Sequence, residues 1–278
     1  MKIAIITNIT KDIGLVTAMQ IAQLICGRAE VYMSDDCILP GETEVKYIPY
    51  EEIWNTVNMA LVIGGDGTLL RVAARCAKNS IPALGINLGK VGFLTEVEIA
   101  DIKNSIDSLL DGHYTIDRRM LLKMRINNEN VSYHALNDIV VSKPDGIKLI
   151  AVDLYTDNEL VYHYIADGLI IATPTGSTGY SISAGGPVVD PRMQLYIATP
   201  ICPHMLSVRS AVLSADKDIV IRISREYSDN SAVISTDGER QRFISADDEI
   251  RISKSNYEFE LIRIGSNSFY NTLINKLS

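Results

Sequence analysis

The stretch that decides the fold is Ala60-Leu61-Val62-Ile63-Gly64-Gly65-Asp66-Gly67-Thr68-Leu69-Leu70. Four consecutive apolar residues run into glycines, and apolar residues at helical spacing follow, namely Leu70, Ala73, Ala74 and Ala77. A short continuous apolar run that ends in glycines is typical of a parallel strand covered on both faces. The stretch therefore predicts a strand, a tight turn and a helix, the unit from which parallel α/β sheets are built.

The same alternation extends on both sides of this stretch, from residue 1 to about residue 112. Short apolar runs at Lys2–Ile6 and Ala83–Ile86 predict two more strands. Two further helices, which end at Gly27 and Gly112, are predicted from the apolar stripes Leu15, Ala18, Ala22, Ile25 and Ile99, Ile102, Ile106, Leu109. We expect residues 1–114 to form an α/β domain with helices on both faces of a parallel sheet.

The chain changes character near residue 115, where strand-like segments replace the helices. The predicted strands, separated by turn signals, include Leu121–Ile126, Ile147–Tyr155, Leu160–Tyr164, Ile219–Ile223, Ala232–Ser235 and Phe259–Ile264. Regularly spaced short strands indicate a β-rich domain of layered or sandwiched sheets, which we place at residues 115–265. Residues 266–278 are expected to pack back on the first domain, and a site between the two domains is the default expectation.

Composition narrows the class of function. A chain of 278 residues that is 47% hydrophobic and 22% charged is typical of a globular protein of about two domains. The net charge of −8 disfavours general binding to nucleic acids or to anionic membranes. No apolar run approaches the ~18 residues of a membrane helix, and the first run is too short for a signal peptide. We expect a cytoplasmic protein with no nucleic-acid or membrane partner, and the histidines and cysteines show no metal-ligand spacing.

The glycine turn at Gly64–Thr68 has two interpretations that the sequence leaves open. Glycines let a bulky ligand approach the backbone, and free N–H groups at the start of a helix favour an anion. A carboxylate at Asp66 would repel a phosphate unless it has another task, such as accepting a proton from an attacking hydroxyl or holding Mg²⁺. In the second interpretation, Asp66 only caps a helix that begins at Thr68.

A second glycine-rich segment, Asp167–Pro187, combines a predicted strand at Leu169–Ala172 with a Thr/Ser/Gly loop and a short helix from about Ser177. No charged side chain lies between its two ends. This composition suits neutral hydrogen bonding to a nucleotide, with Tyr180 stacking on it or closing the pocket. A loop that only caps the helix is the alternative.

The pair Asn137-Asp138 interrupts the otherwise apolar run Tyr133–Val141. In a strand the two side chains would face opposite sides, so that one could reach a ligand. An asparagine pairs well with an adenine edge, and a carboxylate accepts from ribose hydroxyls. A bulge or a sheet rim would explain the pair equally well.

Taken together, these segments resemble the NAD kinase family. The matching stretches are Gly64–Thr68 (GGDGT), Gly85–Thr95 (GxNxGxxGFLT), Asn137-Asp138 (a paired Asn–acid motif), Asp167–Pro187, His204–Arg209 (HxLSxR) and Phe269–Leu273. GGDGT alone is shared with phosphofructokinases and with lipid kinases of the diacylglycerol type. The Asp167–Pro187 block is much more specific, and the matches follow the family's order from about residue 60 to residue 273.

The resemblance implies transfer of the γ-phosphoryl group of ATP, bound with Mg²⁺ or another divalent cation, to the 2′-hydroxyl of the adenosine ribose of NAD, giving NADP. It also implies a Rossmann-like N-terminal domain, a β-rich C-terminal domain, and homo-oligomers, dimers or tetramers, in which the active sites are formed. By position, Asp66 corresponds to the family's proton acceptor. The NAD- and ATP-binding residues implied in the same way are Asp66, Gly67, Arg71, Asn137, Asp138, Lys148, Asp167, Thr178, Gly179, Tyr180, Ser181, Ile182 and Ser183.

Several positions depart from the family pattern, and three of them bear on contacts to NAD. Asp138 stands where glutamate is more usual, which shortens the reach of the carboxylate by one methylene. Ile165 occupies a position that is often basic, and Glu239 one that is often glutamine, so both bear on contacts to the NAD phosphates. Two alternatives stay open, a GGDGT-type lipid kinase and a non-catalytic NAD(P) sensor, as do polyphosphate as donor and NADH as acceptor.

Overall fold

The computed structural model describes residues 1–41, 43–89, 92–127, 129–144, 148–204, 208–225, 231–265 and 268–277. The chain divides into two compact units. Unit 1 comprises Met1–Arg118 and Glu258–Ser278, and unit 2 comprises Arg119–Tyr257. Strands β7 (Thr115–Ile126) and β18 (Glu249–Arg263) contribute residues to both units. The expected domain boundaries at residues 114 and 265 rest on the change in sequence pattern and stay a prediction.

Unit 1 contains a parallel sheet in the strand order β18-β5-β4-β1-β2-β3. Its strands besides β18 are β1 (Lys2–Thr7), β2 (Glu30–Ser34), β3 (Lys46–Ile48), β4 (Met59–Gly64), β5 (Ala83–Asn87) and the short β6 (Val97–Glu98) beside β5. The central order 3-2-1-4-5 is that of a Rossmann-type sheet, as the sequence predicts. Gly64 pairs with Asn87 at the carboxyl ends of β4 and β5, so these two chain turns lie side by side.

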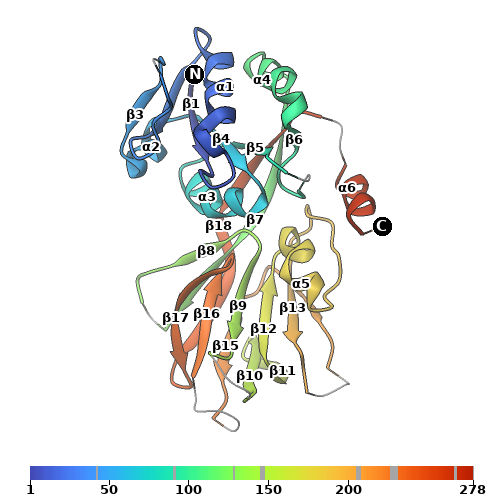
Figure 1. Cartoon of the computed structure of the whole chain (residues 1–278). Coiled ribbons are helices and arrows are strands. Elements are labelled where there is room, and N and C mark those ends of the chain that lie inside the picture. The colour runs from blue at the N-terminus through green and yellow to red at the C-terminus, as the bar shows by residue number, and fades with distance from the viewer. Residues whose placement is uncertain are drawn as a thin grey trace. The chain divides into compact units, whose positions relative to one another are not determined.

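Helices cover both faces of this sheet (Figure 1). They are α1 (Val16–Ile25), α2 (Tyr50–Thr56), α3 (Asp66–Lys78) and α4 (Ile102–Leu110), with short 3-10 turns η1 (Ile13–Leu15) and η2 (Ile99–Asp101). Leu61 of β4 shares one core with Ile21 of α1 and Ile106 of α4. Because side chains alternate along a strand, the equally buried Ala60 and Val62 face the opposite side, where α3 packs against β4.

The predicted face of α3 is partly wrong. Val72 and Ala73 are buried, but so is Leu69, whereas Leu70 and Ala74 are only half-buried. Two adjacent leucines leave the phase of the stripe ambiguous in the sequence, and packing against β4 decides it. Of the C-terminal segment, residues 269–277 form α6 (Phe269–Leu277) within unit 1, where the Phe269 ring centroid lies 6.0 Å from that of Phe93. None of the helices in the described residues is long and apolar enough to cross a membrane.

Unit 2 consists of antiparallel strands in two packed sheets. The six-stranded sheet has the order β14-β13-β12-β9-β16-β17, and the second contains β11-β10-β15-β18 with β7 and β8 beside them. The bounds are β8 (Tyr133–Ala135), β9 (Asp138–Ser142), β10 (Ile150–Thr156), β11 (Glu159–Ala166), β12 (Gly168–Ala172), β13 (Leu195–Ile201), β14 (Ala211–Ser214), β15 (Ile219–Ile223), β16 (Ser231–Thr236) and β17 (Glu239–Ser245).

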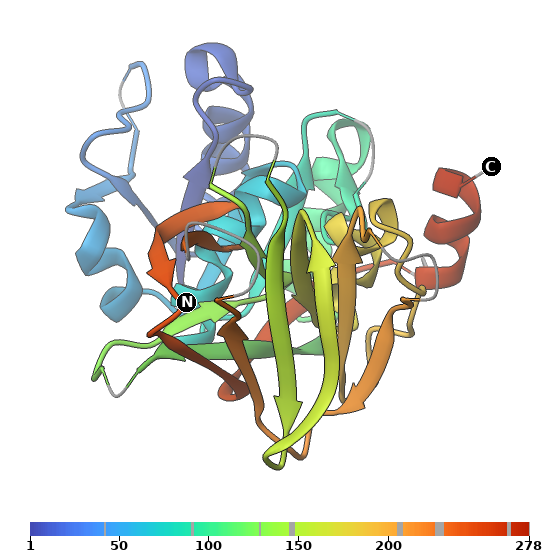
Figure 2. The same cartoon turned by 90° about the horizontal axis from the view of Figure 1, so that it is seen from below.

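The core of unit 2 lies between its two sheets. Val141 and Ile171 of the six-stranded sheet share one apolar cluster with Val152 and Ile221 of the other, which confirms the predicted sandwich of β-rich layers. Figure 2 shows the antiparallel course of the β10–β11 hairpin in yellow-green. One predicted strand extends outside the described residues, because Ile147 is not among them.

The run Tyr133–Val141 is not one strand, contrary to the prediction. β8 ends before Leu136 and β9 begins after Asn137, and the two strands belong to different sheets. The backbone N–H groups at the break donate to the carboxylate of Asp237, from Leu136 and Asn137 at 2.7 Å and from Asp138 at 3.1 Å. These donors are therefore not available to a strand ladder, and the sheet changes at this point.

Candidate active site

The first group of polar residues lies at the carboxyl end of the unit 1 sheet. β4 ends at Gly64, and α3 begins two residues later at Asp66. A Cβ atom on Gly64 would lie 2.3 Å from the Thr68 Oγ1 atom, so only glycine lets the first turn of α3 come this close to the strand. The N–H groups and the positive end of the helix dipole are thus presented at the sheet edge, where they favour an anion.

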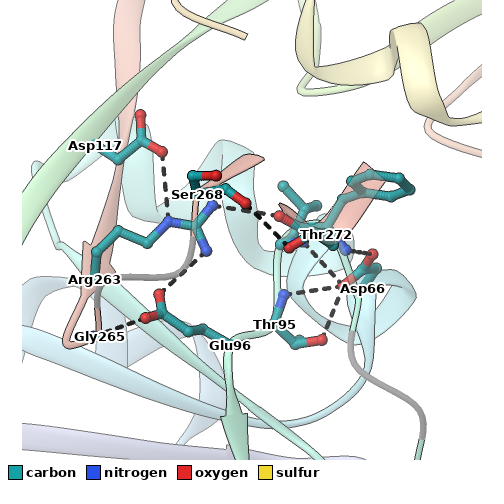
Figure 3. Close-up of polar contacts among 10 residues, drawn as sticks. Asp66, Thr95, Glu96, Asp117, Arg263, Gly265, Ser268 and Thr272 are labelled. Carbon is teal, nitrogen blue, oxygen red and sulfur yellow. Dashed lines mark hydrogen bonds and ion pairs between the residues drawn. The ribbon is translucent and has the colours of Figure 1, made fainter. Parts of the chain in front are cut away.

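The carboxylate of Asp66 is held by four hydrogen bonds from one short segment (Figure 3). The N–H of Phe93 donates to Oδ2 at 2.8 Å. Oδ1 accepts from the N–H groups of Leu94 at 3.2 Å and Thr95 at 3.0 Å, and from Thr95 Oγ1 at 2.9 Å. Three of these bonds end on Oδ1 and only one on Oδ2. Because each carboxylate oxygen offers about two acceptor positions, Oδ2 keeps one position for a further donor.

The alternative in which Asp66 caps the following helix is wrong. The helix begins at Asp66 itself, its N-cap residue is Gly65, and no side chain forms a capping hydrogen bond. The carboxylate instead faces the segment after β5. A Cβ atom on Gly92 would lie 1.7 Å from Asp66 Oδ1, so the glycine makes room for the carboxylate. Two further residues of the matched stretch, Lys90 and Val91, lie outside the described residues.

Two cations flank the same helix terminus. The Lys11 ammonium lies 3.3 Å from where a Cβ of Gly65 would be, and Arg71 lines a hollow of about 430 Å³ next to it. Neither side chain forms an ion pair with another described residue. The Nδ2 atom of Asn87 is buried and has no hydrogen-bond partner in the described part of the chain. Gly67 is exposed, and a Cβ there would meet nothing within 4 Å. This edge can therefore accept a phosphate group from several directions.

The second group of predicted residues lies in unit 2, where the structure brings the Asn–acid pair and the Thr/Ser/Gly loop together. β12 leads into η3 (Thr175–Thr178) and then α5 (Tyr180–Ser183). The Thr173 N–H donates to the Asn137 carbonyl oxygen at 2.8 Å. A Cβ on Gly176 would lie 2.1 Å from that same oxygen, so the loop packs directly on the pair.

The side chains of the Asn–acid pair present acceptor atoms to which no described residue donates. Asn137 Oδ1 is buried and unpartnered among the described residues. Asp138 is 6% exposed, and no described side chain or backbone group donates to its carboxyl. Burial, and next the charge of Asp237, raise the pKa of Asp138 to about 7. Burial also raises the pKa of Asp237 to about 6, against the opposing effect of its three N–H donors. A ligand with hydroxyl or amino donors would satisfy the pair.

The predicted loop residues divide into two kinds. Ser181 is fully buried, and its Oγ lies 2.9 Å from Thr199 Oγ1, so its side chain serves packing. Thr178 Oγ1 donates to the Thr175 carbonyl at 3.3 Å. The exposed side chains in this turn are Tyr180 and Ser183, whereas Gly179 and Ile182 are partly buried.

Two predicted residues are not brought to the Asn–acid pair. Asp167 immediately precedes β12, at the opposite end of that strand from the loop, and its carboxylate binds Lys143 Nζ at 2.7 Å. Lys148 is exposed near the start of β10, whose first residue pairs with Ala166 beside Asp167. Their assignment to nucleotide binding stays a prediction. In the HxLSxR match, residues 205–207 lie outside the described part of the chain.

Two residues that shape the unit 2 site, Asp237 and Arg119, are not among those predicted from the sequence. Asp237 begins a turn with Gly238, both at positive φ, and an Asp-Gly pair between two strands is a signal for such a hairpin. Its second role, the three bonds to residues 136–138, has no local signal. Arg119 is 3% exposed and donates to Thr175 Oγ1 at 3.2 Å, and nothing in the sequence distinguishes it from a surface arginine.

Among the described residues, no group of three or more histidine, cysteine or acidic side chains is placed so that it could hold a metal ion. Unit 1 combines a helix terminus that can bind a phosphate with two cations and a fixed carboxylate, and unit 2 carries a Thr/Ser/Gly loop suited to a nucleotide. This combination defines the class of protein as a nucleotide-dependent phosphotransferase.

Comparisons with known proteins give the family. The model of the ATP-NAD kinase N-terminal domain matches residues 3–114, and that of the C-terminal domain matches residues 136–264. NAD kinase of Thermoanaerobacter sp. strain X514 is 38% identical over 285 residues, covering 100% of this chain and 99% of the relative. NAD kinase of Natranaerobius thermophilus is 35% identical over 280 residues, with coverages of 99% and 97%.

The comparison with solved structures also finds kinases of NAD or NADH. Yeast NADH kinase complexed with NADH has a TM-score of 0.88 at 25% identity, covering 99% of this chain and 86% of that one. An NAD kinase from Archaeoglobus fulgidus in complex with ATP has a TM-score of 0.77 at 27% identity, covering 100% and 98%. The chain belongs to the NAD kinase family, an enzyme family of phosphotransferases. The resemblance seen in the sequence is confirmed, and the relatives do not support the lipid-kinase alternative.

Proposed function

We propose that this chain transfers the γ-phosphoryl group of ATP to the 2′-hydroxyl of the adenosine ribose of NAD, giving NADP and ADP. The observation that carries the proposal is the Asp66 carboxylate, fixed by four donors and with acceptor capacity left on Oδ2. Two similar solved structures support the choice of substrates, since yeast NADH kinase is complexed with NADH and the NAD kinase from Archaeoglobus fulgidus with ATP.

In unit 1 the proposed roles are phosphate binding and proton acceptance. The N–H groups at the start of α3, with Lys11 and Arg71, bind the phosphates of ATP, which arrives as its complex with Mg²⁺ or another divalent cation. Asp66 Oδ2 accepts the proton of the 2′-hydroxyl while the new oxygen–phosphorus bond forms and the bond to ADP breaks. A carboxylate that is already held in place needs little reorganisation at that moment.

In unit 2 the proposed role is recognition of adenosine. Asn137 Oδ1 accepts from the adenine amino group, and the Asp138 carboxyl accepts from a ribose hydroxyl. Tyr180, half-exposed in the loop, stacks on the nucleotide or closes the pocket. Asp167, Lys148 and the backbone of the 178–183 turn retain their assignment to nucleotide binding.

The family resemblance also supports a homo-oligomer, dimer or tetramer, in the cytoplasm. The oligomer is measured by light scattering on the purified protein. A monomer at micromolar concentration with full activity would contradict this part of the proposal.

The central test is NADP formation by the purified protein, followed with an NADP-specific dehydrogenase. NAD is supplied with ATP-Mg²⁺ or with polyphosphate, and each donor is tested again with NADH as acceptor. We expect NADP from NAD and ATP, and none from 2′-deoxy-NAD, because a site built to bind a hydroxyl strongly rejects the analogue that lacks it. Absence of NADP with every donor would overturn the proposal and leave the non-catalytic sensor. A diacylglycerol vesicle assay is expected to show no phosphorylated lipid.

A further inference from the structure

Arg263, near the end of β18 in unit 1, joins three segments of that unit (Figure 3). Its guanidinium donates to Asp117 Oδ2 at 3.4 Å through Nε and to Glu96 Oε2 at 3.3 Å through Nη1. Nη2 donates to the carbonyl oxygen of Phe93 at 3.3 Å. The side chain is 20% exposed and that of Glu96 only 7%, so this is not a solvated surface ion pair.

Glu96 fixes the guanidinium from the other side. Its Oε1 accepts from the Gly265 N–H at 2.8 Å, while its own N–H donates to the Gly85 carbonyl at 3.2 Å. Arg263 therefore sits between a carboxylate anchored in the sheet and a backbone carbonyl of the loop that follows β5. A planar guanidinium with donors in fixed directions holds such an arrangement better than a single ammonium would.

The carbonyl that Arg263 binds belongs to the segment that holds Asp66. The carbonyl of Phe93 and the N–H of Leu94 are the two ends of one peptide group, and this N–H donates to Asp66 Oδ1. The N–H of Phe93 donates to Asp66 Oδ2. A cation on the carbonyl end polarises the peptide and strengthens the bond made by its N–H end, because hydrogen bonds in a chain reinforce each other.

We propose that Arg263 is a positioning residue for the phosphoryl transfer: through the Phe93–Leu94 peptide it fixes the orientation of the Asp66 carboxylate without touching substrate. This inference rests on the proposed function, in which Asp66 accepts the proton. It assigns the Arg263–Glu96–Asp117 cluster a role in turnover, not only in the stability of unit 1.

The test compares Arg263→Gln, Arg263→Lys and the matched control Arg118→Gln. Arg118 also lies in unit 1 and pairs with Glu260 at 3.1 Å, but it makes no bond to residues 93–96. Because a misplacement of about 1 Å can cost about a hundredfold in rate, we expect Arg263→Gln to lower kcat by about 10- to 100-fold with both KM values within about twofold. Arg263→Lys is expected to recover part of kcat, and Arg118→Gln to retain the wild-type value.

A second readout does not depend on activity. Amide hydrogen exchange of Phe93, Leu94 and Thr95 is expected to accelerate in Arg263→Gln and to stay unchanged in Arg118→Gln. Wild-type kcat in Arg263→Gln, or an equal loss in the Arg118 control, would overturn the inference. Unchanged exchange at these three amides would overturn it as well.

If Arg263→Gln does not fold, Glu96→Gln replaces it, because this variant keeps an acceptor for the Gly265 N–H but removes the charge that orients Arg263. A lower kcat at unchanged KM is expected, and wild-type kcat would contradict the inference. Asp66→Asn is measured alongside to separate the two proposals. If Asp66→Asn has the wild-type kcat, the assignment of Asp66 fails. If kcat falls in Asp66→Asn but keeps the wild-type value in Arg263→Gln, only the role of Arg263 is refuted.

Discussion

Asp66 in unit 1 and Asp138 in unit 2 are the same residue type in opposite surroundings. Asp66 receives four hydrogen bonds from residues of its own unit. Asp138 is almost fully buried, receives none from the described residues, and has its pKa raised to about 7 by burial and by neighbouring Asp237. The difference shows that the hydrogen-bond donors around a carboxyl group, not its residue type, decide whether the group is fixed in one orientation without a ligand.

The two surroundings suit two tasks. A carboxylate with its donors in place is held in one orientation, which a proton acceptor needs during a fast step. A buried carboxyl without donors gains most from a ligand that supplies them, because an unpaired polar group in the interior is costly. Asp66 is therefore assigned to turnover and Asp138 to binding, and the following experiments test that division.

The largest effect is expected from Asp66→Asn. The amide cannot accept the proton, and general-base assistance contributes about 10²–10⁴-fold in rate, so kcat is expected to fall by that factor. KM for NAD is expected to change little, because recognition of the adenosine is proposed for Asn137 and Asp138 in unit 2. Steady-state kinetics of NADP formation measure both values, and a variant that turns over like the wild type would remove Asp66 from the mechanism.

The next effect concerns the place that Gly92 leaves for the Asp66 carboxylate. An alanine Cβ would lie 1.7 Å from Oδ1, so Gly92→Ala must displace the carboxylate. A displacement of about 1 Å is expected to lower kcat about a hundredfold. Gly89→Ala is the control, since a Cβ there meets nothing within 4 Å. Equal kcat in the two variants would mean that the orientation of Asp66 does not limit turnover.

Asp138→Asn tests the binding side of the comparison. Loss of the carboxylate acceptor is expected to raise KM for NAD about tenfold, as for one hydrogen bond to a charged group, with kcat within about threefold. The exposed Asp216 provides the control in Asp216→Asn. A kcat loss as large as that of Asp66→Asn, with unchanged KM, would reverse the two assignments.

The same variant has a stability effect that depends on pH. The folded protein holds the Asp138 proton up to about pH 7, whereas the unfolded chain releases it near pH 4, so unfolding free energy falls as pH rises between these values. Asp138→Asn removes this pH-dependent fall in the unfolding free energy, because the amide does not titrate. It is expected to stabilise the protein by about 1–3 kcal/mol at pH 8 and by less at pH 5, measured by urea unfolding. Equal changes at both pH values would show that Asp138 does not titrate in this range.

The smallest effects are expected at the cations beside α3. Lys11→Gln and Arg71→Gln each remove one exposed charge, so KM for ATP is expected to rise about three- to tenfold at low salt and less at high salt. Lys78→Gln, at the other end of the same helix, is the control. An unchanged KM for ATP in both variants would place the phosphates elsewhere.

Local patterns in the sequence predicted much of each unit. The apolar run before Gly64 and the stripe of α4 predicted the α/β sheet, and the spaced strands after residue 115 predicted the sandwich. The mistakes fall where two local solutions compete. Either Leu69 or Leu70 fits the buried face of α3 in the sequence, and only the structure shows that Leu69 is the buried one. The run Tyr133–Val141 has the pattern of one strand, but its N–H groups at residues 136–138 donate to Asp237, and the strand is interrupted there.

The sequence by itself determined the alternation of strands and helices before residue 115, the strand-rich pattern after it, the glycine turns and the family, because strand and helix periods and short motifs are local properties. Only the tertiary structure decided which residues the motifs contact. The Phe93–Thr95 stretch surrounds a carboxylate 27 to 29 positions away, and Arg263 reaches the same loop from the far end of the chain. Hydrogen bonds between such distant residues depend on the packed sheet, and no local pattern encodes them.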